Sequence, residues 1–98
     1  MDYSSALKVF RVSGDLARQV LASGTGIDLR PGSFAVGSSC RTRFAQIAAI
    51  IEAVSAECFD LFVGRSFEEY LMMWLAETSD IFSSNVLFKI IGERPGLT

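Results

Sequence analysis

Alternating and periodic apolar positions organise the first third of the chain. Apolar side chains face both sides of the segment 7–12, which predicts a strand buried on both faces. In the segment 15–22, Leu16 and Val20 lie four positions apart, and this spacing predicts an amphipathic helix. Gly24 follows as a candidate helix stop.

A glycine-rich stretch over 24–39 has no regular period. Its apolar residues stand among turn formers and are Ile27, Leu29, Phe34 and Val36. A loop of this length is either anchored to the core by its own side chains or used for binding. We expect the anchored form, and a loop that binds a small anionic ligand is the alternative.

A β-hairpin is predicted in the middle of the chain. The segment 41–54 begins with alternation and becomes almost wholly apolar, which favours one long strand. The segment 58–63 returns to a period of two, so the two segments form an antiparallel pair around Ser55-Ala56-Glu57.

A second helix begins near residue 66. Ser66 and Glu69 have the spacing of a capping box. The expected core stripe follows helical spacing and consists of Phe67, Tyr70, Leu71, Trp74 and Leu75. The helix should end between residues 79 and 84, and 86–91 reads as a last strand.

The order strand, helix, strand, strand, helix, strand predicts an α+β fold of the ferredoxin-like split βαβ type (βαββαβ). In this fold one antiparallel sheet carries both helices on one face. We expect a single domain over 1–98, with a core of about 7–91 and a short tail at 92–98. The strands hold more apolar surface than two helices can cover, which suggests an interface; the residues concerned are Phe10, Val12, Ile47, Ala49, Ile51, Leu87 and Ile90.

Composition and charge limit which binding partners and which cellular compartment we expect. The chain has 98 residues, half of them hydrophobic, and a formal net charge of −2. With acidic and basic residues interspersed, nucleic acid is not an expected partner. No apolar run is long enough for a membrane span and no signal peptide is evident, so we expect a cytoplasmic protein that binds no membrane.

The chain offers few residues for catalysis or metal binding. It has no histidine, and its two cysteines are Cys40 and Cys58. Histidine-based nucleophile activation and histidine-bearing zinc sites are therefore absent, and we expect no catalytic residue and no metal site. A disulfide between the cysteines is not expected, because the hairpin would hold them far apart.

Five charged residues are candidates for other roles. Arg41 and Arg43 share a face of the predicted strand and could bind a carboxylate or phosphate, although exposed charges also protect a sheet edge. Asp60 on the neighbouring strand could pair with one of them. The adjacent Glu68 and Glu69 point about 100° apart on a helix, so capping and solvation explain them better than acid–base chemistry.

Two further motifs have ordinary structural explanations. Gly24-Thr25-Gly26 lacks the strand-to-helix context of a phosphate-binding loop. Tyr70 and Trp74, at helical spacing, are expected in the core rather than in a ligand cage. No cofactor-binding residue can be assigned from these patterns.

An ordered series of segments resembles one protein family. The segments are VSGDLARQVL (12–21), GIDLRPGSF (26–34), SCRTRFAQ (39–46) and FDLFV (59–63), followed by 65–67, 70–71 and 74–75. Over roughly residues 7 to 80 they resemble the gamma subunit family of heterotetrameric sarcosine oxidase. More distantly, they are similar to the folate-binding aminomethyltransferase (T-protein) superfamily.

The resemblance implies a non-catalytic accessory subunit of an oxidoreductase complex that demethylates sarcosine and passes the one-carbon unit to tetrahydrofolate. FAD, FMN, NAD and tetrahydrofolate would belong to the larger subunits, and this chain would hold no cofactor. The likeness is to the C-terminal half of the family's longer members, and the apolar segment 81–91 extends beyond it. Partners would be the larger subunits or further copies of this chain. The alternatives are a stand-alone folate-like ligand-binding module and a homo-oligomeric interaction domain.

Overall fold

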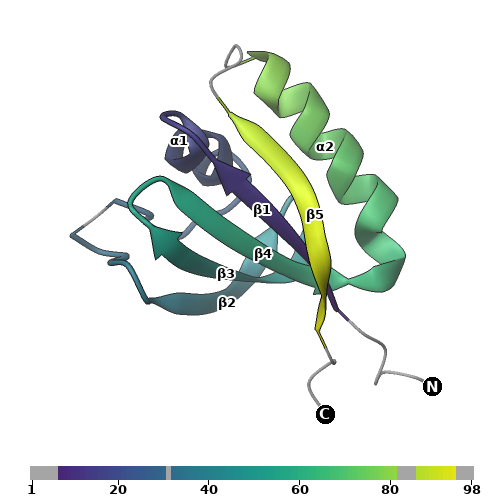
Figure 1. The fold of residues 1–98 in the computed structure, drawn as a ribbon, viewed down its shortest axis with the longest axis horizontal. Coiled ribbons are helices and arrows are strands. Elements are labelled where there is room, and N and C mark those ends of the chain that lie inside the picture. Colours follow the sequence, from purple (N-terminus) through teal and green to yellow (C-terminus); the bar gives the residue numbers. More distant parts are fainter. Residues whose placement is uncertain (1–6, 31, 82–85, 95–98) are drawn as a thin grey trace.

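A five-stranded antiparallel sheet with two helices forms the fold (Figure 1). The computed structural model describes residues 7–30, 32–81 and 86–94. The elements in chain order are β1 (Leu7–Ser13), α1 (Ala17–Ala22), β2 (Ser39–Phe44), β3 (Ile47–Ser55), β4 (Cys58–Gly64), the 3₁₀ turn η1 (Arg65–Phe67), α2 (Glu68–Ile81) and β5 (Leu87–Arg94). This confirms the α+β, ferredoxin-like class predicted from the sequence.

The sheet order is β2-β3-β4-β1-β5, so the first strand lies inside the sheet. β1 pairs along its whole length with β4 on one side, from Leu7 opposite Gly64 to Ser13 opposite Cys58. On its other side it pairs with β5, with a register shift between Val9 and Phe10. This central position explains why apolar side chains occur on both faces of β1.

The single long strand predicted over 41–54 is wrong, because the segment is a hairpin of β2 and β3. Its two-residue turn is Ala45-Gln46, with φ of 52° and 74°. Tight hairpins favour positive φ at both turn positions, and Asn-Gly is the usual sequence for it. This turn carries neither residue, so the sequence gives no local signal of it.

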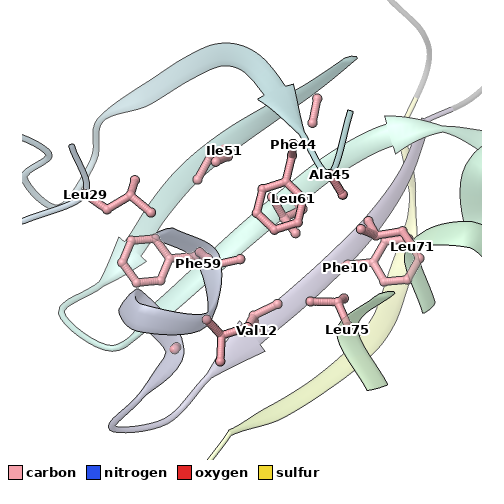
Figure 2. Packing of buried hydrophobic residues seen from close by; sticks show 14 of the residues in the cluster. Phe10, Val12, Leu29, Phe44, Ala45, Ile51, Phe59, Leu61, Leu71 and Leu75 are labelled. Atoms are coloured by element: carbon pink, nitrogen blue, oxygen red, sulfur yellow. The ribbon is translucent and has the colours of Figure 1, made fainter. Parts of the chain in front are cut away.

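Both helices pack on the same face of the sheet. Phe10, Leu61 and Ile51 are opposite one another on neighbouring strands, and all three are fully buried. The helices contribute buried residues to the same cluster, namely Ala17, Val20 and Leu21 from α1 and Leu71 and Leu75 from α2. Figure 2 shows Leu71 and Leu75 pointing toward Phe10 on the sheet.

The excess of apolar strand surface is smaller than the sequence suggested. Phe10, Val12 and Ile51 are completely buried on the helix-covered face. The face opposite the helices, which we call the outer face, carries Val9, itself buried. Of the residues predicted to be uncovered, Leu87 is the clear case, with 73% of its surface exposed.

Both helices begin later than predicted. α1 starts at Ala17, after a turn in which the Ala17 N–H donates to the Gly14 carbonyl (3.1 Å). Before α2, the chain forms the 3₁₀ turn η1, so Ser66 lies inside that turn and not at the N-cap of the α-helix. The predicted capping box is therefore not formed, and the first turn of α2 instead places Glu68 and Glu69 at the positive end of the helix dipole.

Candidate functional site

The loop between α1 and β2 is anchored to the core, as expected. Leu29 and Phe34 are buried and Ile27 packs against the same cluster, whereas Val36 is 60% exposed. The loop ends in a short extension of the sheet, where Gly37 N–H donates to the Ala53 carbonyl (2.8 Å).

Arg18 of α1 anchors this loop through hydrogen bonds. Its guanidinium donates to the Leu29 carbonyl and to the Ala56 carbonyl (2.6 Å for the latter). The same group lies 5.0 Å from the centre of the Phe59 ring, within cation–π range. Arg18 therefore ties the loop to the β3–β4 turn, and its donors are occupied by backbone carbonyls.

The charged side chains of the loop neutralise each other. Arg30 donates to both carboxylate oxygens of Asp28, through Nε (2.9 Å to Oδ1) and Nη2 (2.8 Å to Oδ2). The Ser33 hydroxyl adds a third side-chain donor (3.1 Å). These bonds hold the pKa of Asp28 well below its usual 3.8. An anionic ligand in this loop would have to compete with Asp28 for Arg30.

The Gly24-Thr25-Gly26 motif packs against aromatic rings. A Cβ added to Gly24 would lie 2.9 Å from both Phe44 Cζ and Trp74 Cη2. Thr25 and Thr42 share a hydrogen bond between their hydroxyls (3.1 Å). The motif follows the end of α1 and does not begin a helix, so it lacks the geometry of a phosphate-binding loop.

Asp60 pairs with Arg11, not with Arg41 or Arg43. Arg11 Nε and Nη2 donate to the two oxygens of Asp60 at 2.8 and 3.0 Å, and Asp60 is only 3% exposed. The predicted partners lie on β2, which β3 separates from β4. The partner of Asp60 lies instead on β1, which neighbours β4 on its other side, and the spacing of apolar residues does not specify this strand order.

Arg41 and Arg43 are exposed on the edge strand β2, and both side chains lie on the outer face. Arg43 donates to the Gln46 carbonyl of the adjacent turn (3.1 Å). The structure brings no buried polar group to them. Charged side chains at this position discourage pairing of the sheet edge with another strand.

The α2 residues singled out from the sequence divide between two environments. Trp74 is half-buried and packs edge-to-face on Phe44, with ring centres 4.9 Å apart. Tyr70 donates its hydroxyl to the Ala45 carbonyl (2.7 Å), although 45% of the residue is exposed. Glu68 lies 3.6 Å from Lys8 Nζ, while Glu69 is exposed, so the two carboxylates do not converge.

The predicted core stripe of α2 is wrong at two positions. Phe67 is 40% exposed and Tyr70 45% exposed, whereas Leu71 and Leu75 are fully buried. The buried face of α2 consists of Leu71, Leu75 and Ser79, at intervals of four residues. The side of the helix away from them faces solvent. We call Phe67, the last residue of η1, together with Tyr70 and Met73 of α2, the α2 outer stripe; Met73 is 62% exposed. Spacing alone does not separate the two faces, because Phe67 lies four residues before Leu71; Phe67 belongs to the turn η1, ahead of the α-helix.

Among residues 7–30, 32–81 and 86–94, no three His, Cys, Asp or Glu side chains cluster as metal ligands. Cys40 and Cys58 are free and half-buried, which agrees with the prediction of no disulfide. Within the same described part, no helix has the length and apolar character needed to cross a bilayer.

What the described surface offers is contact area. Its bidentate charge pairs are satisfied internally, and its exposed large apolar side chains lie on the loop before β2, on β3, on η1 and α2, and on β5. Such a surface suits recognition of another macromolecule better than a reaction on a small molecule.

Two solved structures illustrate what this chain is similar to. Heterotetrameric sarcosine oxidase from Corynebacterium sp. U-96, in complex with pyrrole 2-carboxylate, matches with a TM-score of 0.78 and 26% identity over 86% of this chain. The glycine cleavage system aminomethyltransferase T of Bartonella henselae matches with a TM-score of 0.73 and 14% identity over 87% of this chain, a likeness of fold.

The lengths of these relatives differ from that of this chain. The chain spans 43% of the matched sarcosine oxidase chain and 24% of the aminomethyltransferase. No curated protein matches it in sequence. The family model of the sarcosine oxidase gamma subunit matches residues 1–81, which is most of the sequence. This chain therefore belongs to the sarcosine oxidase, gamma subunit family.

Proposed function

We propose that this chain is an accessory subunit of a sarcosine-oxidase-like complex and assembles with larger subunits that carry the chemistry. One observation carries the proposal: the fold matches a heterotetrameric sarcosine oxidase with a TM-score of 0.78 over 86% of the chain. Membership of the gamma subunit family supports the same assignment.

A non-catalytic role is the second part of the proposal. The chain contains no histidine, and its buried carboxylate Asp60 is committed to a bidentate ion pair with Arg11. In this proposal FAD, FMN, NAD and tetrahydrofolate bind the larger subunits. The complex would work in the cytoplasm, where the free thiols of Cys40 and Cys58 stay reduced.

Co-expression tests the assembly. The chain, produced together with the larger subunits of a sarcosine oxidase complex, should co-elute with them in gel filtration, and the pooled complex should oxidise sarcosine. A chain that elutes apart from those subunits at every concentration would rule out the accessory role. The isolated chain, supplied with the same cofactors, should show no sarcosine oxidation; measurable turnover would instead make it an enzyme.

Self-association is a second candidate, and the edge strand β5 favours it. Leu87 and Ile91 are 73% and 40% exposed there. Light scattering on the isolated chain would then give twice its 10.7 kDa mass, whereas a monomer at high concentration argues against it. The folate-binding alternative has less support because Asp28 occupies Arg30 in the loop. Calorimetry with tetrahydrofolate tests it, and no heat at millimolar ligand would exclude it.

A further inference from the structure

We propose that the α2 outer stripe, with the carboxylates beside it, is the docking surface for a basic segment of a larger subunit. That segment presents apolar side chains bordered by Arg or Lys. The inference rests on the proposed function. To that function it adds which surface of this chain binds the larger subunit and what kind of side chains the partner presents.

The apolar part of this surface is continuous along the helix. Phe67, Tyr70 and Met73 follow one another at intervals of three, so each is a neighbour of the next. Their exposed fractions are 40%, 45% and 62%. Aromatic and Met side chains are enriched at the energetically important centres of protein interfaces.

Two of the three side chains are already fixed in place. The Tyr70 hydroxyl is bound to the Ala45 carbonyl at 2.7 Å, which holds the ring at the surface. The Phe67 ring lies over Gly64, where an added Cβ would be 3.5 Å from Phe67 Cδ2. Ordered side chains lose little conformational entropy when a partner binds, so these rings are prepared for contact.

Charge identifies the class of partner. Glu69, Glu77 and Asp80 are exposed and lie on the same side of α2 as Met73, four residues before it, four after it and seven after it. Among the described residues none of the three has an ion pair, whereas Glu68 shares Lys8 with Glu93, at 3.6 and 3.0 Å. The sequence from 66 to 81 contains no Lys or Arg. A surface with this pattern attracts a positively charged partner.

The same charges argue against a symmetric dimer through this stripe. A two-fold contact would place the Glu69, Glu77 and Asp80 carboxylates of one copy opposite those of the other. Like charges across an interface are strongly unfavourable. A second copy is therefore not the occupant of this surface, and a basic segment of a different subunit is.

Binding of matched variants to the larger subunits tests the inference. Met73→Ser and Glu77→Lys alter the docking surface, and we expect each to weaken binding by about tenfold or more. Val36→Ser and Glu57→Lys make the same changes at exposed positions elsewhere and should stay within about twofold of wild type. Val36 is 60% exposed, close to the 62% of Met73, which makes the pair well matched. Circular dichroism confirms that every variant is folded.

Salt dependence gives an independent readout. Affinity of the wild-type chain should fall as sodium chloride rises, and Glu77→Gln should reduce that dependence. If the wild type binds and all four variants bind equally well, the docking surface is wrong while the accessory role stands. If the wild type itself does not bind the larger subunits, both proposals fall.

Discussion

At Gly24 the fold requires a residue without a side chain. It lies beneath the edge-to-face pair of Phe44 and Trp74, and Ala45 N–H donates to its carbonyl at 2.8 Å. We expect Gly24→Ala to lower the free energy of unfolding by about 1–3 kcal/mol, because the new methyl group would overpack a fully buried Phe44. Urea unfolding followed by circular dichroism measures the change.

Gly26→Ala is the matched control for this substitution. A Cβ at Gly26 meets nothing within 4 Å and the residue has no positive φ. Alanine there should raise the free energy of unfolding by about 0.5 kcal/mol, through the entropy of the unfolded chain. Equal effects at Gly24 and Gly26 would show that the aromatic contact does not constrain the loop.

The hydrogen bonds of Asp28 make the free energy of unfolding depend on pH in the acid range. Hydrogen bonds from Arg30, together with that from Ser33, hold its pKa below the ordinary 3.8. Above that value the carboxylate is ionised whether folded or unfolded, and its bonds contribute fully. As pH falls below about 4 the unfolded chain binds a proton first, so this contribution is lost as pH passes through the lower folded pKa.

The expected result is a free energy of unfolding that decreases from about pH 4 downward. Asp28→Asn should show a smaller decrease, measured by urea unfolding at a series of pH values. Glu93 acts in the same direction, since Lys8 lowers its pKa. An Asp28→Asn profile identical to that of the wild type would contradict the assignment to Asp28.

The β2–β3 hairpin stores backbone strain that a single substitution should release. Gln46 has a φ of 74° and carries a side chain in the left-handed region. Gln46→Gly should therefore raise the free energy of unfolding by about 1 kcal/mol. The carbonyl that accepts from Arg43 belongs to the backbone and is retained. Chemical unfolding with an unchanged denaturant slope would measure the gain.

Gln46→Ala separates strain from the loss of the glutamine side chain. It keeps the Cβ that conflicts with positive φ, so its stability should equal that of the wild type. A stabilising effect of Gln46→Ala as large as that of Gln46→Gly would point to the side chain and away from the backbone.

The elements with strong local periodicity were predictable. β1, β4 and the buried positions Leu71 and Leu75 follow from apolar spacing. The β2–β3 turn was not predictable, because Ala45-Gln46 adopts positive φ with no glycine or asparagine to indicate it. Tertiary bonds compensate for the unfavourable turn: Tyr70 binds the Ala45 carbonyl and Gly24 accepts from the Ala45 N–H. Such bonds join residues distant in sequence and leave no local pattern.

The candidate site was less predictable than the fold. Asp60 was recognised as one half of an ion pair, but its partner depends on strand order, which periodicity does not specify. Phe67 and Tyr70 were placed in the core because a helix starting at 66 allows one broad apolar face. Only the packing of α2 on the sheet shows that this face divides into a buried side and an exposed side.

At the scale of the whole molecule, β5 completes the sheet although the family match ends at residue 81. It covers one side of β1, with Ile90 opposite Phe10 and Phe88 opposite Val12. A chain ending after residue 81 should therefore unfold or aggregate, because a long apolar strand would become the sheet edge. Circular dichroism and light scattering on the shortened chain measure this.

Leu87→Ser provides the control in the full-length chain. This residue is 73% exposed, so the substitution should change the free energy of unfolding by no more than about 0.5 kcal/mol. A shortened chain that remained folded and monomeric would show that β5 is dispensable for the domain.

The inner position of β1 also determines when the fold can form. β1 finds its two neighbours later in the sequence, at 58–64 and 87–94. Until residues 58–64 have been synthesised, β1 has no partner on either edge, and its second edge stays unpaired until residues 87–94 follow. Long-range pairing of this kind slows folding and leaves apolar strands exposed in the meantime. The sheet is therefore completed only after residues 87–94 have been synthesised and can pair with β1.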